Sequence, residues 1–155
     1  MRELRRQLTL RPRVSTFTYD ALNRPSTAAY ADGSTLSYTF DLGGRLTQLQ
    51  DSIGGTITRV WDGLDRLTSE TTAQGTVSYA YDAASRMTGL TGGTQAQAIY
   101  GYDNDNRLTA ITQGSTALAF GYDNASRRTS ATLPTGITAA YVYDAASELT
   151  RLNLR

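Results

Sequence analysis

Hydrophobic and polar residues alternate along short stretches of this chain, and turn-forming residues separate these stretches at nearly regular intervals. Residues 36–40 read Leu-Ser-Tyr-Thr-Phe and residues 77–81 read Val-Ser-Tyr-Ala-Tyr, so every second side chain is large and apolar. A period of two places these side chains on one face of a β-strand. The pattern therefore predicts an all-β protein.

The same pattern recurs as a repeat of 20 or 21 residues. An aromatic residue followed by Asp occurs seven times, and the steps between the aromatic residues are 21, 21, 20, 21, 20 and 21. The seven pairs, which are the predicted structural signature of the repeat, are Tyr19-Asp20, Phe40-Asp41, Trp61-Asp62, Tyr81-Asp82, Tyr102-Asp103, Tyr122-Asp123 and Tyr143-Asp144.

A second aromatic residue stands two positions before most of these pairs. It is Phe17, Tyr38, Tyr79, Tyr100, Phe120 or Tyr141, and Arg59 takes its place in the third copy. Thirteen of the fourteen aromatic residues therefore fall on two repeat positions, and only Tyr30 lies elsewhere. Each repeat is expected to place two rings on the same side of a sheet.

The Asp and the residues after it predict a turn. An Asp carboxylate can accept hydrogen bonds from backbone N–H groups one or two residues further on. Four residues after most Asp residues comes Arg-Leu-Thr or a variant, such as Arg45-Leu46-Thr47 or Arg107-Leu108-Thr109. We expect the Arg to pair with the Asp across the turn. The Leu or Met should face inward, between an outward Arg and an outward Thr.

A Gly-containing turn separates one repeat from the next, because Gly supplies the positive φ of a tight hairpin. Two turns in each repeat give strands about ten residues apart, which is typical of all-β proteins. About fifteen strands are predicted: 3–9, 14–20, 24–30, 34–41, 45–51, 55–62, 66–72, 75–82, 86–91, 96–103, 107–112, 116–123, 127–133, 137–144 and 148–154.

One repeat buries too little apolar area to fold alone, so neighbouring hairpins must pair. The expected fold is one array over residues 1–155, an antiparallel sheet of tandem hairpins that curls into a partial shell or solenoid. Glu3-Leu4-Arg5 lies one period before Arg24-Pro25-Ser26, so the chain begins in mid-repeat and is expected to be a piece of a longer array. Strand edges at 3–9 and 148–154 predict homo-oligomers by edge pairing.

Composition excludes several classes of function. The chain has no His and no Cys, and all fifteen of its basic residues are Arg. These absences remove imidazole bases, thiol nucleophiles, zinc sites and disulfides. The net charge of +1 gives no field that would attract nucleic acid. No signal peptide or membrane span is visible, so we expect a soluble protein without metal or cofactor.

Three motifs were weighed as sites of chemistry. Asp103-Asn104-Asp105-Asn106 lacks the Gly of a calcium loop and has Arg107 at a ligand position, so turn chemistry is the better interpretation. Asp62 and Asp65 fall on turn positions that are polar in the other copies. Ser residues three positions after the Asp have no His or Lys to activate them. We therefore predict no catalytic residue.

On the residues of the repeat, the chain resembles the YD-repeat, or Rhs-repeat, family. That family's signature is Tyr-Asp-x-x-x-Arg-Leu-Thr, a Gly-containing turn and an aromatic-x-Tyr-Asp return, and the likeness covers about residues 14–154. The resemblance implies β-hairpin arrays that spiral into hollow shells. In bacterial polymorphic toxins and insecticidal toxin complexes such shells enclose a toxic polypeptide, and in teneurin-like animal proteins they are adhesion modules.

Two functions follow as hypotheses. The first is a non-catalytic scaffold, a segment of Rhs shell wall whose partner is its cargo or the rest of its own polypeptide. The parent protein would then be secreted or exposed at the cell surface. The second is a carbohydrate-binding or adhesion module in which exposed aromatic rings stack on sugars. Rings packed against each other favour the scaffold, and a row of rings more than half exposed along a groove favours sugar binding.

Overall fold

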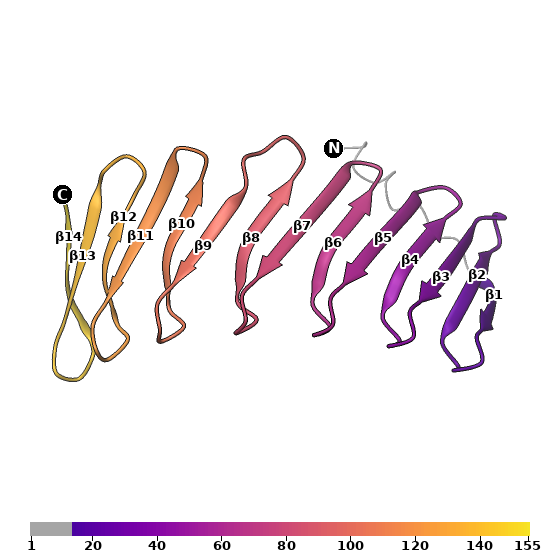
Figure 1. Ribbon diagram of the computed structural model, residues 1–155, viewed down its shortest axis with the longest axis horizontal. Coiled ribbons are helices and arrows are strands. Elements are labelled where there is room, and N and C mark those ends of the chain that lie inside the picture. The colour runs from indigo at the N-terminus through magenta and orange to yellow at the C-terminus, as the bar shows by residue number, and fades with distance from the viewer. Residues whose placement is uncertain (1–13) are drawn as a thin grey trace, which may run out of the picture. The chain divides into compact units, whose positions relative to one another are not determined.

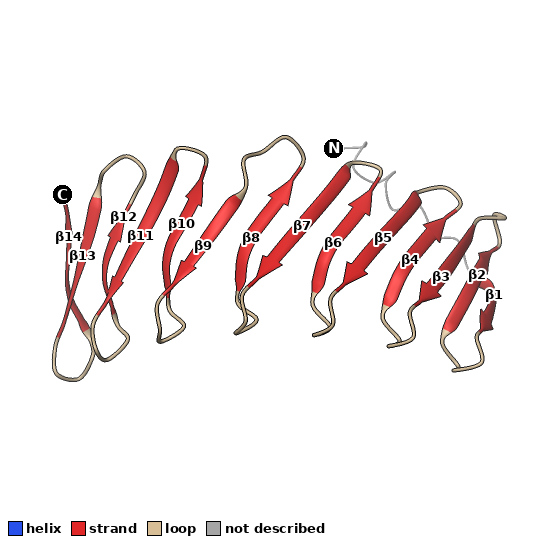
Figure 2. Ribbon diagram, in the orientation of Figure 1, coloured by secondary structure: helices blue, strands red, loops and turns tan. Residues whose placement is uncertain are grey.

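The computed structural model describes residues 14–155, and within this range the chain consists of strands and turns without a helix (Figures 1 and 2). The strands are β1 (Val14–Tyr19), β2 (Pro25–Tyr30), β3 (Thr35–Phe40), β4 (Leu46–Asp51), β5 (Gly55–Trp61), β6 (Leu67–Thr72), β7 (Gly75–Tyr81), β8 (Met87–Gly92), β9 (Ala98–Tyr102), β10 (Leu108–Gln113), β11 (Thr116–Tyr122), β12 (Arg128–Thr132), β13 (Thr138–Tyr143) and β14 (Leu149–Leu154). The predicted fold class, tandem antiparallel hairpins, is confirmed. The strand expected at 3–9 lies outside the described residues.

The chain divides into two compact units, Met1–Thr76 and Val77–Arg155. The described part of the first unit contains β1 to β6, and the second contains most of β7 and all of β8 to β14. Within each unit every strand pairs antiparallel with the strands next to it in the sequence. Each unit is therefore a simple meander of hairpins, as the two turns per repeat predict.

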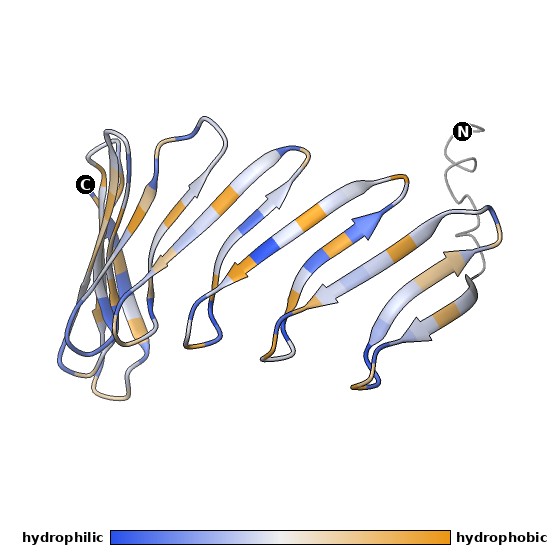
Figure 3. Cartoon of the chain, turned by 45° about the vertical axis from the view of Figure 1, so that its right-hand side comes forward, coloured by the Kyte–Doolittle hydropathy of each residue, from blue (hydrophilic) through white to orange (hydrophobic). Residues whose placement is uncertain are grey.

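Strand register puts the rings and the aliphatic side chains on one face of each unit. Tyr38 lies opposite Leu49, and Leu49 in turn lies opposite Ile57 on the next strand. In the second unit, Tyr100 lies opposite Ile111. We call this side the aromatic face; Thr, Ser, Gln and Ala dominate the other. The alternation is visible along the strands in Figure 3.

The described residues have little of a conventional core. The buried hydrophobic residues among them are Ala28, Ala131 and Ala139, and no large side chain there is fully buried. Among residues 14–155, each strand contacts only its sequence neighbours, so the described part of each unit is a single layer whose side chains cover one another across adjacent strands. Stability must then come from contacts between neighbouring hairpins.

A register shift precedes the aromatic–Asp pair in each hairpin. In the β3–β4 pairing, for example, it falls between Thr39 and Phe40, and Thr47 donates its hydroxyl hydrogen to the Thr39 carbonyl 3.1 Å away. Pro25, which cannot donate to a ladder, lies opposite Tyr19 beside such a shift. Pro25 therefore stands at an irregular position of the strand pairing, where its missing N–H breaks no ladder hydrogen bond.

Candidate functional site: the Asp turns and the inter-repeat clamp

The turn after each aromatic–Asp pair has the same backbone in all seven copies. The Asp carbonyl accepts the N–H three residues on, and the Asp N–H donates to the carbonyl four residues on, as in Asn106→Asp103 (3.2 Å) and Asp103→Arg107 (3.0 Å). The residue before the Arg or Glu position has a positive φ, from 59° to 83°. This is a three-residue hairpin loop, a type I turn followed by a left-handed residue.

The Asp side chain holds this turn together. In the fifth copy, Oδ1 of Asp103 accepts the N–H groups of Asp105 and Arg107, both at 2.9 Å, and Oδ2 accepts the Nε hydrogen of Arg107 at 2.7 Å. The Asp carboxylate thus accepts the backbone N–H groups two and four residues further along the chain, whereas the prediction was one or two residues. The predicted Asp–Arg ion pair is present in six copies: 20–24, 41–45, 62–66, 82–86, 103–107 and 123–127.

These hydrogen bonds also act on the ionisation of the Asp residues. The backbone N–H of Arg107 is the largest influence on Asp103 and lowers its pKa, the Arg107 guanidinium lowers it further, and partial burial opposes both. For Asp41 the Arg45 side chain is the largest influence, again lowering the pKa. These carboxylates are therefore held in the charged form, which is the opposite of what a general acid requires.

Within each unit, the Arg side chain connects one turn to the next. Nη1 of Arg45 donates to the Asp62 carbonyl and to the Asp65 carboxylate, both at 2.7 Å. In the second unit, Nη1 of Arg86 donates to the Asp103 carbonyl at 3.0 Å and to Oδ1 of Asn106 at 2.9 Å. We call this contact the inter-repeat clamp. The expectation that these Arg side chains point outward is wrong, because they lie along the row of turns and are only 20–29% exposed.

The aromatic residue of the following repeat is part of the clamp. The guanidinium carbon of Arg107 lies 5.0 Å from the centre of the Tyr122 ring, and the Tyr122 hydroxyl donates to the Leu108 carbonyl at 2.8 Å. Corresponding ring contacts join Arg24 to Phe40, Arg86 to Tyr102 and Arg127 to Tyr143. Trp61 makes the matching hydrogen bond from its indole N–H to the Leu46 carbonyl at 3.0 Å. The clamps of Arg86, Arg107 and Arg127 thus combine an ion pair, a cation–π contact and a hydrogen bond to a backbone carbonyl.

The residue with positive φ in each turn not only shapes the backbone but can also accept a hydrogen bond from the clamp, a role that the sequence did not predict. This position is Asn23, Gly44, Asp65, Ser85, Asn106, Ser126 or Ser147, and a positive φ is unusual for Ser. The side-chain oxygens of Asp65, Asn106, Ser126 and Ser147 accept the clamp Arg of the preceding repeat. The signal in the sequence is the restriction of this position to Gly and short polar residues.

Two irregular copies show how the clamp varies. Glu148 stands in the Arg position of the seventh copy, and its N–H donates to Asp144 at 2.9 Å without an ion pair between the side chains. Arg128 stands where most copies have Leu or Met. Its guanidinium lies 4.9 Å from the centre of the Phe120 ring, and Arg128 itself is exposed and stands beside the register shift of the β11–β12 pairing.

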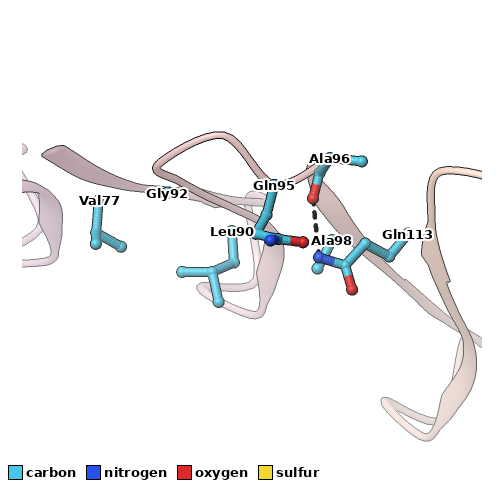
Figure 4. A pocket seen from close by; sticks show the side chains of 7 residues that line it. All are labelled: Val77, Leu90, Gly92, Gln95, Ala96, Ala98 and Gln113. Carbon is cyan, nitrogen blue, oxygen red and sulfur yellow. Dashed lines mark hydrogen bonds between the residues drawn. The ribbon is translucent and has the colours of Figure 1, made fainter. Parts of the chain in front are cut away.

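Unit 2 carries a hollow of about 350 Å³ on its aromatic face (Figure 4). Its lining is Val77, Leu90, Gly92, Gln95, Ala96, Ala98 and Gln113, and Gln113 donates to the Ala96 carbonyl at 3.0 Å. Four of the other six copies have Leu, Ile or Val where β9 has Ala98, so the small Ala98 side chain leaves space here. No titratable group lines it, and it offers nothing for acid–base chemistry.

The motifs considered for chemistry are all part of turns. Both Asp62 and Asp65 are bound by Arg side chains, and Asp105 lies 3.3 Å from Arg107. Within residues 14–155 no three metal-ligating side chains come together. The same residues contain no helix long and apolar enough to cross a membrane.

The geometry defines the class: a β-hairpin repeat array in which, within each unit, one turn is clamped to the next. Residues 61–97 and 102–138 match the RHS repeat family model. The resemblance of this chain to the Rhs-repeat family is thereby confirmed over these two stretches. No match among curated proteins was found.

Solved structures of toxin-complex proteins share the fold. One is a TcdB2-TccC3-Cdc42 crystal structure, which is 17% identical with a TM-score of 0.69 and covers 90% of this chain. Another is TcdB2-TccC3 without its hypervariable C-terminal region, with 18% identity, a TM-score of 0.68 and 90% coverage. A third is the Photorhabdus luminescens Tc holotoxin pore, with 17% identity, a TM-score of 0.66 and 89% coverage. The chain spans 9% of each of these longer chains.

Proposed function

We propose that this chain is a non-catalytic structural scaffold, a segment of Rhs-repeat shell wall that in its parent protein encloses or presents a toxin or effector polypeptide. The observation that carries the proposal is the inter-repeat clamp. The clamp links the Arg of one hairpin to the backbone carbonyl of the Asp in the next. The charged side chains of the repeat therefore hold neighbouring hairpins of the wall together.

The chemistry of the repeat favours a structural role over an enzymatic one. The repeated carboxylates are kept ionised by Arg, and the sequence has no His, Cys or Lys that could act as a base or nucleophile. Solved chains with this fold belong to Tc toxin assemblies. By analogy with them, the partners of this wall are its own polypeptide and its cargo, and the parent protein is secreted or surface-exposed.

The proposal is tested on the full natural polypeptide that contains these repeats, by limited proteolysis of the segment it would enclose. Arg86→Ala combined with Arg107→Ala removes two clamps, and the enclosed segment should become protease-sensitive. Arg151→Ala, at an exposed position outside the clamps, is the matched control. Equal digestion of the segment in the native, clamp-variant and control proteins would refute enclosure by this wall.

Carbohydrate binding is a second candidate, favoured by one place in the chain. The aromatic rings of residues 30–143 are partly covered, whereas Phe17 and Tyr19 are 51% and 55% exposed, so a continuous row of open rings has little support. In the third repeat, however, a Trp stands beside an ion pair on the aromatic face. That combination offers both a stacking surface and hydrogen-bonding groups.

A further inference from the structure

Arg59 interrupts the aromatic face of the third repeat. The other six copies have an aromatic residue at this position, and the third has Arg59 on β5. The register places Glu70 of β6 directly opposite, and Arg59 Nε donates to Glu70 Oε2 at 2.7 Å. The two side chains are 32% and 29% exposed, so a molecule in solution can reach them.

Trp61 lies two residues after Arg59 and on the same face of the strand. Its indole N–H donates to the Leu46 carbonyl at 3.0 Å, which fixes the orientation of the ring. This is the chain's single Trp, and it occurs in the repeat where the neighbouring ring is replaced by an ion pair. A flat ring and a pair of hydrogen-bonding groups are thereby held side by side by adjacent strands.

The ion pair retains hydrogen-bonding capacity for a ligand. A guanidinium has five N–H donors, and among the described residues only the Nε hydrogen of Arg59 is engaged, with Glu70. The carboxylate of Glu70 likewise has free acceptor positions. The donors of Arg59 and the acceptors of Glu70 therefore lie together, on the same face of the sheet as the Trp61 ring.

The charge balance of the pair indicates what the ligand is. An anion would have to compete with Glu70 for Arg59, and a cation would have to compete with Arg59 for Glu70. A neutral molecule rich in hydroxyl groups can donate to the carboxylate and accept from the guanidinium without separating them. The C–H face of a pyranose ring also matches the apolar surface of an indole.

We propose that Arg59, Trp61 and Glu70 form a binding site for a neutral pyranose unit of an oligosaccharide. The proposal rests on the second candidate function, and the scaffold role stands independently of it. The simpler role of the pair, which is to fill the space of the missing ring, predicts no ligand and is distinguished by the experiment.

The single Trp makes the test direct, because intrinsic Trp fluorescence reports on this site alone. The whole chain is titrated with maltohexaose, cellohexaose and chitohexaose, and at least one should give a saturable change. Arg59→Tyr, which restores the ring of the other copies, should weaken binding at least tenfold without lowering the urea midpoint. Glu70→Gln should weaken it several-fold. Thr58→Ala, on the opposite face of β5, is the control and should bind normally.

Three results would overturn the proposal. The first is no saturable signal with any neutral oligosaccharide up to about 20 mM. The second is binding that Arg59→Tyr leaves unchanged. The third is a response confined to charged polysaccharides such as heparin, because the binding would then be due to the positive charge of Arg59 alone. The scaffold proposal is tested by limited proteolysis and the sugar site by Trp fluorescence, so either proposal can fail without affecting the test of the other.

Discussion

The hydroxyl groups of the clamp tyrosines give a measurable share of the stability of unit 2. Tyr102 and Tyr122 donate to the carbonyls of Met87 and Leu108 at 2.9 Å and 2.8 Å, and both hydrogen bonds are part-buried. Tyr143 makes the same bond at 2.9 Å in a more exposed setting. Phe at these three positions keeps the ring beneath the guanidinium and removes only the hydrogen bond, as Phe40 does naturally.

The expected loss follows from the burial of each bond. A neutral hydrogen bond contributes about 1 kcal/mol when part-buried, and about half as much when exposed. The three sites lie in successive repeats and should be nearly additive, so the triple Tyr→Phe variant should lose about 2.5 kcal/mol. With a urea m-value of about 2 kcal/mol/M, its midpoint falls by about 1.2 M. Far-UV circular dichroism across a urea series measures this.

The chain provides a control of identical composition. Tyr79, Tyr100 and Tyr141 occupy the other ring position of three repeats, and no hydroxyl hydrogen bond of theirs is seen in the described part of the chain. Changing these three to Phe should move the free energy of unfolding by less than about 0.5 kcal/mol per site. Equal midpoints for the two triple variants would refute the role assigned to the clamp hydroxyl.

Three further predictions concern the turns. Asp103→Ala should lower the urea midpoint more than Asp103→Asn, because the Asn oxygen can still accept the N–H groups of Asp105 and Arg107; equal effects would contradict this. The folded-state pKa of Asp103 is lowered, so its contribution is complete above the unfolded pKa and lost as pH falls through the folded one. The midpoint should stay level from pH 8 to 5 and decline below about pH 4, and a decline beginning near pH 6 would contradict this. An added Cβ meets nothing within 4 Å at Gly33 or Gly63, but only Gly33 has a positive φ, of 84°. Gly63→Ala should therefore stabilise by about 0.5 kcal/mol and Gly33→Ala destabilise by about 1 kcal/mol, and thermal melts showing the same sign for both would refute the backbone argument.

Local chemistry explains why the hairpins could be predicted from sequence. The strands follow from alternation such as that of residues 36–40, and the turns follow from Asp and Gly at fixed offsets. Pro25 could be assigned to an irregular position because its missing N–H is a property of the residue itself. Each of these inferences needs only the residues within one hairpin.

The clamp could not be predicted because its acceptors belong to the neighbouring hairpin. Arg45 donates to the backbone carbonyl of Asp62. Every residue has a backbone carbonyl, so this acceptor cannot be recognised from the sequence. An Arg next to a turn was therefore expected to face solvent. The single-layer packing is likewise not visible in the composition, which does not reveal whether apolar side chains contact each other between two layers or between neighbouring strands of one layer.

The locality of these contacts has a consequence for folding and for the length of the array. Within each unit strands pair only with their chain neighbours, and clamp contacts such as Arg45–Asp65 join residues 20 positions apart. Loops this short close at low entropic cost, so the protein should fold faster than β-sandwiches of similar size, from a nucleus at any hairpin. A segment of one period can then be gained or lost by in-frame duplication or deletion, since no distant contact has to be rebuilt.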